Sequence, residues 1–490
     1  MTGHVGEEVR AISRARIVGA PTDELVDVHL EGGAVERIEP SGSAPLTGAL
    51  DADGAFLIPG LWDAHVHFGN WAQTFTRLDL SGATSARQCA RLLAEEARAN
   101  PPIAGGAVIG MGYHGALWDP APTTSLLDTV MGEIPAIAVS HDLHSAWLNS
   151  AAQNLLGLPL REGLVREGEW FTLSPAVDAL PAADPDEPLR AAIADAASRG
   201  VVGITDFDFG NHLDVWRERN ARSLTQLRVR AGFYPEFLGA AIERGLATGD
   251  ALSEDGLVTL GPLKIISDGS LNTKTAYCFD AYPGGGHGVL SVSEDELTRL
   301  AARAHEAGIE CAIHAIGDHA NAIALKVFST TGVRGSIEHA QLMRADDIVE
   351  MGERHITASI QPAHLLDDRE PSAQLWPGKV PYEFQRLSKA GVTLTLGSDA
   401  PVSPLDPWLQ IAAAVGRGEP ETDPWEPGER LTPATALFSS TGGVGRILPG
   451  SPADLALLAA DPLAPGISAA DLRAMRVLAT ICAGRVTHAD

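Results

Sequence analysis

The sequence has little cysteine, and what it has is scattered. Its four cysteines, in a chain of 490 residues, form no CxxC pair. This excludes a disulfide framework and a structural zinc site built on cysteines, and it suits a reducing compartment. The first ten residues, MTGHVGEEVR, include acidic side chains and no apolar stretch, so we expect no signal peptide and a cytoplasmic location.

Positive charge is also scarce, because 36 Lys and Arg residues stand against 63 Asp and Glu residues, for a formal net charge of −27. Such an excess of negative charge argues against partners that are nucleic acids or anionic membranes. The sequence also lacks an apolar run of about 18 residues that could span a bilayer. With 45% hydrophobic residues, it predicts a globular protein with a large core.

Both ends of the chain are rich in predicted strands. The first 60 residues or so contain LVDVHLEGGAVERIEP and GAFLIPG, and the last 45 or so contain ADLALLAAD and VLATICAGRVTH. These runs alternate apolar and polar residues between Gly- and Asp-containing turns. We therefore expect residues 1–58 and 446–490 to form one small β-sandwich from the two termini.

The middle of the chain alternates strand-like and helix-like segments. One strand is expected to end at His65 and His67, and seven more are expected at 201–207, 227–234, 261–267, 309–317, 335–341, 356–362 and 392–400. The helix between two of these strands shows its start clearly, because Ser293 and Glu296 have the spacing of a capping box. Eight such repeats indicate an α/β fold, a TIM (β/α)8 barrel over residues 59–445.

Residues 70–200 interrupt this alternation. They are punctuated by Pro and Gly and show few convincing strands. We expect them to be an insertion after the first barrel strand, which could serve as a lid.

The stretch LIPGLWDAHVHFGNW, residues 57–71, ends an apolar run with two histidines two positions apart. Residues i and i+2 of a strand point to the same side, so both imidazoles are expected to project from one face. Such a pair is typical of a metal site if further ligands follow downstream.

Further ligand-type residues do follow, at the ends of later predicted strands. They are Lys264, His314, His339 and Asp399. Because the carboxyl ends of barrel strands converge on one mouth, these side chains are expected to meet His65 and His67 there. The mixture of imidazole and carboxylate predicts Zn²⁺, with Mn²⁺ or Fe²⁺ as alternatives.

Lys264 lies in a mostly apolar strand, where a charged amine is costly unless it is paired or neutralised. A neutral amine can react with carbon dioxide to give a carbamate, an anion able to bridge two metals. The alternatives are an unmodified lysine paired with Asp268 and a lysine that holds substrate.

These motifs resemble the metal-dependent amidohydrolase superfamily across nearly the whole chain. PGLWDAHVHF is similar to its first-strand signature, and GSDAPV to its last-strand aspartate. LKIISDGSLNTKTA, HAIGDHAN and IEHAQLM resemble the amidohydrolase-3 branch, which includes YtcJ-like proteins and N-substituted formamide deformylases. SHDLHSAWLNSAA, residues 140–152, is similar to a segment of that branch within the insertion.

The resemblance implies a barrel plus a terminal β-sandwich, and hydrolysis of C–N bonds. It implies a metal-site set of His65, His67, Lys264, His314, His339 and Asp399, holding one or two metals. The chain departs from the branch at NTK (272–274), at His319 and after Val165. These departures lie near the expected pocket and bear on the substrate more than on the reaction.

The expected activity is hydrolysis of an amide, formamide or cyclic amide in a small-molecule substrate by metal-activated hydroxide. Asp399 would act as general base and then general acid. His314 and His339 would complete the metal shell, or one of them would steady the oxyanion. We expect substrate-binding roles for His144, Trp147, His364 and Asp268.

Several alternatives use the same residues. The same site would serve a deaminase, a carbamate or ester hydrolase, or an N-acyl amino-acid hydrolase. A non-catalytic metal-binding regulator would retain the fold but catalyse no reaction. Barrels of this shape often form dimers, so a homodimer is an open expectation.

Overall fold

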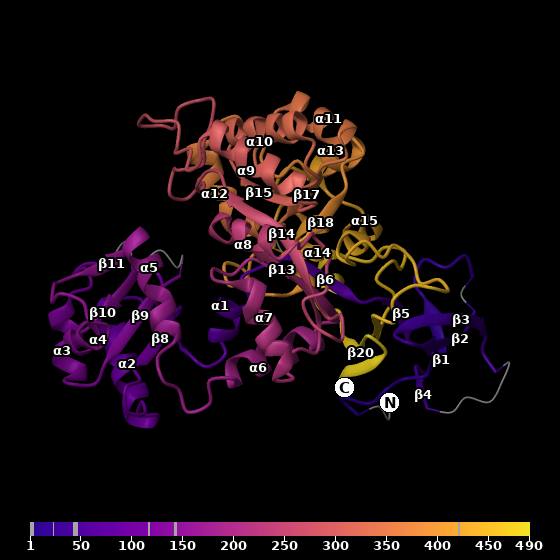
Figure 1. Cartoon of the computed structure of the whole chain (residues 1–490), viewed down its shortest axis with the longest axis horizontal. Coiled ribbons are helices and arrows are strands. Elements are labelled where there is room, and N and C mark those ends of the chain that lie inside the picture. Colours follow the sequence, from indigo (N-terminus) through magenta and orange to yellow (C-terminus); the bar gives the residue numbers. More distant parts are fainter. Residues whose placement is uncertain (1–3, 23, 43–47, 116–117, 142–144, 420–421) are drawn as a thin grey trace. The chain divides into compact units, whose positions relative to one another are not determined.

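The computed structural model describes residues 4–22, 24–42, 48–115, 118–141, 145–419 and 422–490. The chain forms two compact units (Figure 1). One comprises Met1–Phe68 and Ile193–Asp490, and the other comprises Gly69–Ala192.

The larger unit contains an eight-stranded parallel sheet in the order β18-β17-β16-β15-β14-β13-β12-β6. Its strands are β6 (Leu61–Val66), β12 (Val201–Asp206), β13 (Arg228–Phe233), β14 (Val258–Ile266), β15 (Cys311–Ala315), β16 (Gly335–His339), β17 (Thr357–Ile360) and β18 (Leu394–Leu396). A parallel bridge between Val66 and Ala400 joins the two edges, and the Asp399 N–H donates to the His65 carbonyl at 2.7 Å. The sheet therefore approaches closure as a barrel, and all eight predicted barrel strands are confirmed.

Helices follow most of the barrel strands. They are α7 (His212–Ala221), α8 (Leu238–Glu243), α9 (Glu294–Glu306), α10 (Asp318–Thr331), α11 (Ala345–Glu353), α12 (His364–Leu375), α13 (Phe384–Lys389), α14 (Pro407–Gly416), α15 (Pro433–Ser439) and α16 (Ala469–Arg473). Helix α9 buries the stripe Leu297, Leu300, Ala301 and Ala304. The Ser293 hydroxyl accepts the Glu296 N–H at 3.3 Å, while the Glu296 carboxylate pairs with Arg299. The predicted capping box is therefore half formed.

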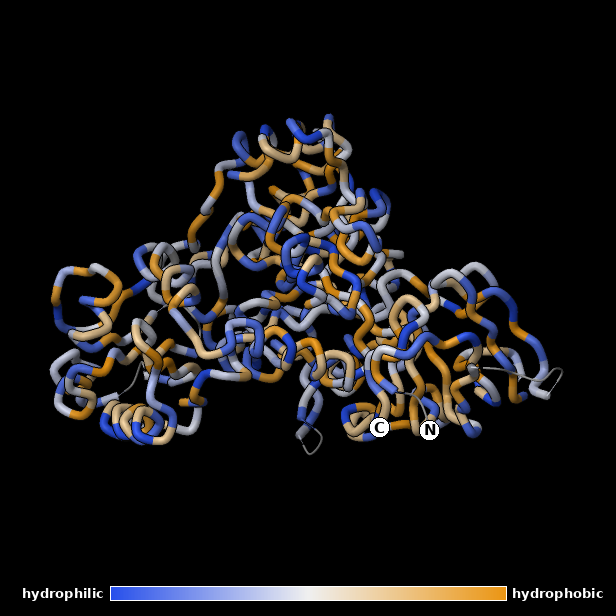
Figure 2. Tube along the Cα trace, turned by 60° about the horizontal axis from the view of Figure 1, so that its bottom comes forward, coloured by the Kyte–Doolittle hydropathy of each residue, from blue (hydrophilic) through white to orange (hydrophobic). Residues whose placement is uncertain are grey.

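The two chain ends meet in one antiparallel and parallel sheet of the same unit, in the order β21-β20-β19-β5-β1-β2-β3, with β4 beside β1. Its strands are β1 (Ala11–Ile17), β2 (Val26–Glu31), β3 (Ala34–Pro40), β4 (Ala49–Asp51), β5 (Phe56–Pro59), β19 (Leu455–Leu458), β20 (Val477–Cys482) and β21 (Arg485–Ala489). An irregularity between Ile12 and Ala15 lets β1 pair with β2 and β4 at one end and with β5 at the other. Both chain ends therefore contribute strands to one sheet, and buried side chains from it form an apolar core of their own (Figure 2). The arrangement as a sandwich stays a prediction.

The smaller unit has a five-stranded sheet in the order β11-β10-β9-β8-β7. Its elements are β7 (Leu78–Asp79), β8 (Val108–Tyr113), β9 (Ala136–Ser140), β10 (Ser145–Leu148), β11 (Leu164–Arg166), α2 (Ala86–Ala99), α3 (Thr124–Met131), α4 (Ser150–Leu155) and α5 (Glu167–Asp178). Helix α1 (Phe68–Gln73) leads into this unit, and α6 (Glu187–Ser198) leads out of it.

The expectation of few strands in this insertion was wrong. Glycine weakens the strand signal of β8, yet a Cβ at Gly110 would come within 2.4 Å of the Leu80 side chain, so the packing requires glycine there. Strand β9 is buried along its whole length and has little of the alternation that marks a half-buried strand. Among the described residues, no helix is both long and apolar enough to cross a membrane.

Candidate active site

The two histidines of the first barrel strand lie together at its carboxyl end. His65 is 1% exposed, and its ring centroid lies 5.8 Å from that of His67. Asp399, just after β18, faces both of them, because its Oδ1 lies 3.4 Å from His65 Nε2 and 3.4 Å from His67 Nε2. The structure therefore brings the first and last barrel strands together around one carboxylate.

Asp399 is held in an unusual backbone conformation, with φ at 57°. His339, the last residue of β16, has φ at 72° and the following Ala340 has φ at 44°. Left-handed backbone is unfavourable for residues other than glycine, and strained residues of this kind cluster at functional sites. Burial opposes ionisation of Asp399, but His65, His67, His339 and His364 outweigh it and lower its pKa well below the usual value. Asp399 is therefore an anion among imidazoles.

A second group forms on the other oxygen of Asp399. His364 Nε2 lies 3.7 Å from Asp399 Oδ2, and the rings of His364 and His339 are stacked with centroids 6.0 Å apart. His339 Nδ1 and His364 Nε2 are buried and have no hydrogen-bond partner among the described residues. Burial lowers the pKa of His339 well below its usual value, which leaves the ring neutral with a lone pair available.

Lys264 lies on β14 with its side chain inside the same cluster. Its Nζ is 3.2 Å from His65 Nε2 and 4.4 Å from the centroid of the Phe207 ring. Burial lowers the pKa of Lys264 to about 8, although Glu338 and Asp399 act in the opposite direction. The neutral amine is therefore far easier to reach near neutral pH than it is in an exposed lysine.

His314 is close to the cluster but is engaged elsewhere. Its ring centroid is 4.5 Å from that of His339, whereas its Nε2 lies 3.3 Å from the Gly269 carbonyl and 3.4 Å from Asp268 Oδ1. Burial and the nearby Lys264 lower the pKa of His314 to about 3. Its place among the metal ligands stays a prediction.

The expected substrate-binding residues are distributed differently. Asp268 is fully buried and accepts the backbone N–H groups of Tyr277, Ile316 and Gly317 at 2.8 to 3.0 Å, which favours a role in holding the loops. Trp147 is fully buried in the insertion, where its indole N–H donates to the Thr123 carbonyl at 2.9 Å. His144 lies outside the described residues.

Sequence reasoning missed Glu338, whose Oε2 lies 2.6 Å from His65 Nδ1. Burial opposes its ionisation, but the hydrogen bond from His65 outweighs that and lowers the pKa of Glu338. A carboxylate inside the apolar stretch GSIEH was the signal that could have found it.

Sequence reasoning also missed a buried group of Asp206, Asp208 and His212 at the end of β12. The spacing of its two acidic residues repeats that of His65 and His67 and could have revealed it. Asp206 already accepts the Phe68 N–H at 2.9 Å and the Trp216 indole N–H at 2.6 Å.

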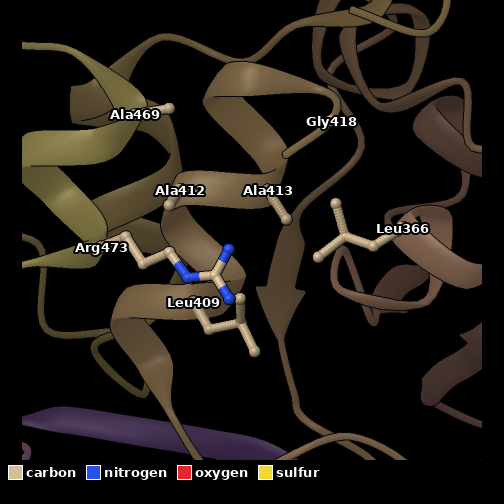
Figure 3. Close-up of a pocket in the computed structure, with 7 residues that line it drawn as sticks. All are labelled: Leu366, Leu409, Ala412, Ala413, Gly418, Ala469 and Arg473. Carbon is tan, nitrogen blue, oxygen red and sulfur yellow. The ribbon is translucent and has the colours of Figure 1, made fainter. Parts of the chain in front are cut away.

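The residues at the strand ends fit a divalent metal ion. They offer neutral imidazoles, one carboxylate and buried nitrogens without a hydrogen-bond partner among the described residues. This set of donor atoms suits Zn²⁺, Mn²⁺ or Fe²⁺. By contrast, the hollow between α12, α14 and α16 (Figure 3) has no such donors. It is lined by Leu366, Leu409, Ala412, Ala413, Gly418, Ala469 and Arg473.

Two named relatives match nearly the full length of the chain. "Putative amidohydrolase YtcJ" of Bacillus subtilis (strain 168) is 27% identical over 518 residues, with 95% of this chain and 96% of the relative covered. "N-substituted formamide deformylase" of Arthrobacter pascens is 25% identical over 500 residues, with 90% of each covered.

A solved structure shows the same fold. An uncharacterized metal-dependent hydrolase from Pyrococcus furiosus superposes with a TM-score of 0.77 at 24% identity, covering 92% of this chain and 99% of that one. The sequence model of the amidohydrolase family matches residues 48–488, which include both histidines of the first barrel strand and Asp399. The chain belongs to the amidohydrolase family.

Proposed function

We propose that the protein is a metal-dependent hydrolase that cleaves the C–N bond of an amide, formamide or cyclic amide other than a peptide. Membership of the amidohydrolase family supports hydrolysis, and the name of the Arthrobacter relative supports a carbon–nitrogen bond as its target. The observation that carries the proposal is the position of Asp399, whose Oδ1 faces His65 and His67 and whose Oδ2 faces His364.

The residues that would hold the metal are His65, His67, Lys264, His314, His339 and Asp399. A bound Zn²⁺, Mn²⁺ or Fe²⁺ would supply hydroxide at neutral pH and polarise the scissile carbonyl. Asp399 is anionic and lies within 3.4 Å of both first-strand imidazoles, so it is placed to accept the proton of the attacking water. It then returns that proton to the leaving nitrogen, because an amine leaves poorly as an anion.

A carbamate on Lys264 is part of this proposal. Lys264 is 2% exposed, and burial lowers its pKa to about 8, which favours the neutral form that attacks carbon dioxide. The nitrogen lone pair forms the new N–C bond, and the amine releases one proton. ¹³C NMR of protein equilibrated with ¹³C-bicarbonate tests this: we expect a carbamate resonance in the wild type and none in Lys264→Arg, and its absence from both would contradict the modification.

The reaction is tested with a panel of N-substituted formamides, linear amides and cyclic amides, incubated with zinc-loaded protein. We expect release of amine from at least one class, and a loss of more than about 100-fold in kcat for Asp399→Asn. Asp454→Asn is the matched control, since Asp454 is also buried and charge-paired, to Arg228, but at the other end of β13. Metal-loaded protein that turns over none of these amides would favour the alternative of a non-catalytic metal-binding regulator. Release of ammonia from an amino-substituted ring would favour a deaminase.

A further inference from the structure

We propose that Phe209 and Val402 form an apolar rim that binds an aryl or alkyl substituent of the substrate beside the scissile bond. The inference rests on the proposed function and deepens it, because it names the part of the substrate that these two side chains recognise. Phe209 follows β12, and Val402 follows β18. These two strands flank β6, since β12 pairs with β6 and a bridge between Val66 and Ala400 joins β6 to the chain just after β18.

The Phe209 side chain is 57% exposed, which is unusual for an aromatic ring. Phe207, two residues earlier, is 1% exposed, and its ring centroid lies 4.9 Å from that of His65. The chain therefore buries one ring against the first barrel strand and leaves the next one open to solvent. A single exposed apolar side chain is common on protein surfaces, so exposure alone does not indicate a site.

Phe209 is distinguished by the two rings on which it stacks. Its centroid lies 4.8 Å from that of Tyr234 and 6.1 Å from that of His67, with 22° between the ring planes in each case. Tyr234 is 5% exposed, and its hydroxyl donates to the Phe207 carbonyl at 2.8 Å, which fixes the ring that supports Phe209. A side chain that is already ordered loses little conformational entropy when a ligand binds to it. Phe209 is therefore a preformed contact surface for an apolar group.

The Phe209 ring lies next to the residues that would hold the metal. His67, on which it stacks, has its Nε2 3.4 Å from Asp399 Oδ1. The intervening Asp208 is 7% exposed, and its Oδ1 lies 4.0 Å from His67 Nδ1, so its carboxylate is directed to the same cluster. A substrate whose carbonyl is bound at this cluster therefore brings its neighbouring substituent within reach of the Phe209 ring.

Val402 supplies the second side of the rim. It is 42% exposed, and its N–H donates to the Asp399 carbonyl at 2.9 Å. The His67 N–H donates to the Ala400 carbonyl at 2.9 Å, so the turn that carries Val402 is tied to the end of the first barrel strand. Exposed apolar side chains therefore follow the strands on both sides of β6.

The chemistry of the rim favours a hydrocarbon substituent. A phenyl ring and an isopropyl group bind aryl or alkyl groups by apolar contact and offer no charge to a carboxylate. Ligand sites commonly combine such apolar surfaces with a few polar groups that fix the reacting atoms. The rim therefore favours amides with an apolar substituent over N-acyl amino acids, whose carboxylate would need a cation.

The test measures the binding of hydroxamates, which chelate zinc through two oxygens and need no turnover. Two pairs of probes each exchange a methyl for a phenylethyl group. They are acetohydroxamate with 3-phenylpropanohydroxamate, and N-methyl- with N-(2-phenylethyl)-N-hydroxyformamide. Calorimetry on zinc-loaded, full-length protein gives the dissociation constants, and we expect the phenylethyl probe of at least one pair to bind about 10-fold more tightly than its methyl partner. The pair that shows this preference identifies the carbonyl or the nitrogen as the side that carries the substituent.

Phe209→Ala should reduce this preference to about 2-fold or less, whereas Phe209→Leu, which keeps an apolar side chain, should retain most of it. Val402→Ala should reduce it by about 2- to 3-fold. Val349→Ala is the matched control, since Val349 is a 53% exposed valine on α11, and it should leave the preference unchanged. Zinc content should stay at the wild-type level in all four variants, because none of them removes a proposed ligand.

A wild type without a preference in either pair, or a Phe209→Ala variant that keeps the preference, would overturn the apolar rim while leaving the proposed function intact. An equal loss of affinity for both members of a pair would also overturn it, since Phe209 would then support the metal site and not bind the substituent. A zinc-loaded wild type that binds none of the four probes would contradict the metal site on which the rim and the proposed function both rest.

Discussion

The Glu338 carboxylate lies 2.6 Å from His65 Nδ1, on the side of the ring away from Asp399. Both residues are 1% exposed, and the Ser336 hydroxyl donates to the other Glu338 oxygen. Since Glu338 is ionised, the proton of His65 is held on Nδ1, and Nε2 keeps its lone pair, as the proposed metal site requires. A carboxylate behind a metal-binding histidine sets its tautomer and orientation in this way.

Glu338→Gln is expected to weaken zinc binding by about 10- to 100-fold, because the amide can accept the His65 proton but does not stabilise the ring as a carboxylate does. The dissociation constant is measured by competition with a chromogenic chelator. The variant should fold normally, since the side chain keeps its size.

Glu350→Gln is the control for this substitution, because Glu350 pairs with Arg354 on the surface of α11. It should bind zinc as the wild type does. Equal zinc affinity in Glu338→Gln and wild type would show that Glu338 does not position His65.

Gly397→Ala is expected to disturb the site through the backbone. A Cβ at this position would lie 2.6 Å from the His65 nitrogen and 2.7 Å from the His65 Cβ. Neither atom can move without shifting β6, so we expect a loss of about 1 to 3 kcal/mol in stability and weaker zinc binding. Thermal unfolding and chelator competition measure the two effects.

Gly445→Ala controls for the loss of a glycine, because nothing lies within 4 Å of the Cβ it would add. It should match the wild type in both measurements. A Gly397→Ala variant with unchanged melting temperature and unchanged zinc affinity would mean that β6 and β18 approach less closely than the structure indicates.

The barrel could be predicted from sequence because each of its strands is a short apolar or β-branched run bounded by turn residues. The convergence of strand ends then follows from the fold, which brings His65 and Asp399 together although 334 positions (399 − 65) separate them. What could not be predicted is which atoms meet, since this depends on rotamers and strand register. Glu338 is an example, because its contact with His65 joins two strands that are far apart in the sequence.

Local spacing was misleading for Asp268. Its position four residues after Lys264 suggested a pair, but four residues of a strand span about 13 Å. Strand β14 ends at Ile266, and the chain then turns so that Asp268 receives three backbone N–H groups, while Lys264 Nζ lies beside His65. Spacing along a strand predicts a shared face and not a contact.

The stability of the terminal sandwich is expected to depend on the charge of Asp27. This residue is 2% exposed and accepts the Arg14 N–H at 2.9 Å, the Ser41 hydroxyl at 2.9 Å and the Gly42 N–H at 3.0 Å. Burial opposes its ionisation, but these hydrogen bonds lower its pKa below the ordinary value of 3.8. A lowered pKa stabilises the fold above pH 3.8, and that contribution is lost as the pH falls through the folded-state pKa.

Asp27→Asn should therefore unfold at lower urea concentration than the wild type at pH 7. The difference between the two proteins should be constant from pH 7 to about pH 5 and should narrow below pH 3.8. Urea unfolding curves at several pH values measure this. A difference that grows as the pH falls would have the wrong sign and would contradict the hydrogen-bonded carboxylate.

Removal of metal is expected to destabilise the barrel, since a cation that binds only the folded state stabilises it by mass action. With free zinc at a thousand times its dissociation constant, this amounts to about 4 kcal/mol. A chelator should therefore lower the melting temperature of the zinc-loaded wild type, and added zinc should restore it.

His65→Ala should have the same melting temperature with and without the chelator. The reason is that Glu338, Lys264 and Asp399 all contact the His65 ring, so its loss removes the centre of the group. Asp454→Asn should keep the chelator effect, since Asp454 pairs with Arg228 away from the strand ends. A chelator effect of equal size in His65→Ala would place the stabilising metal elsewhere in the chain.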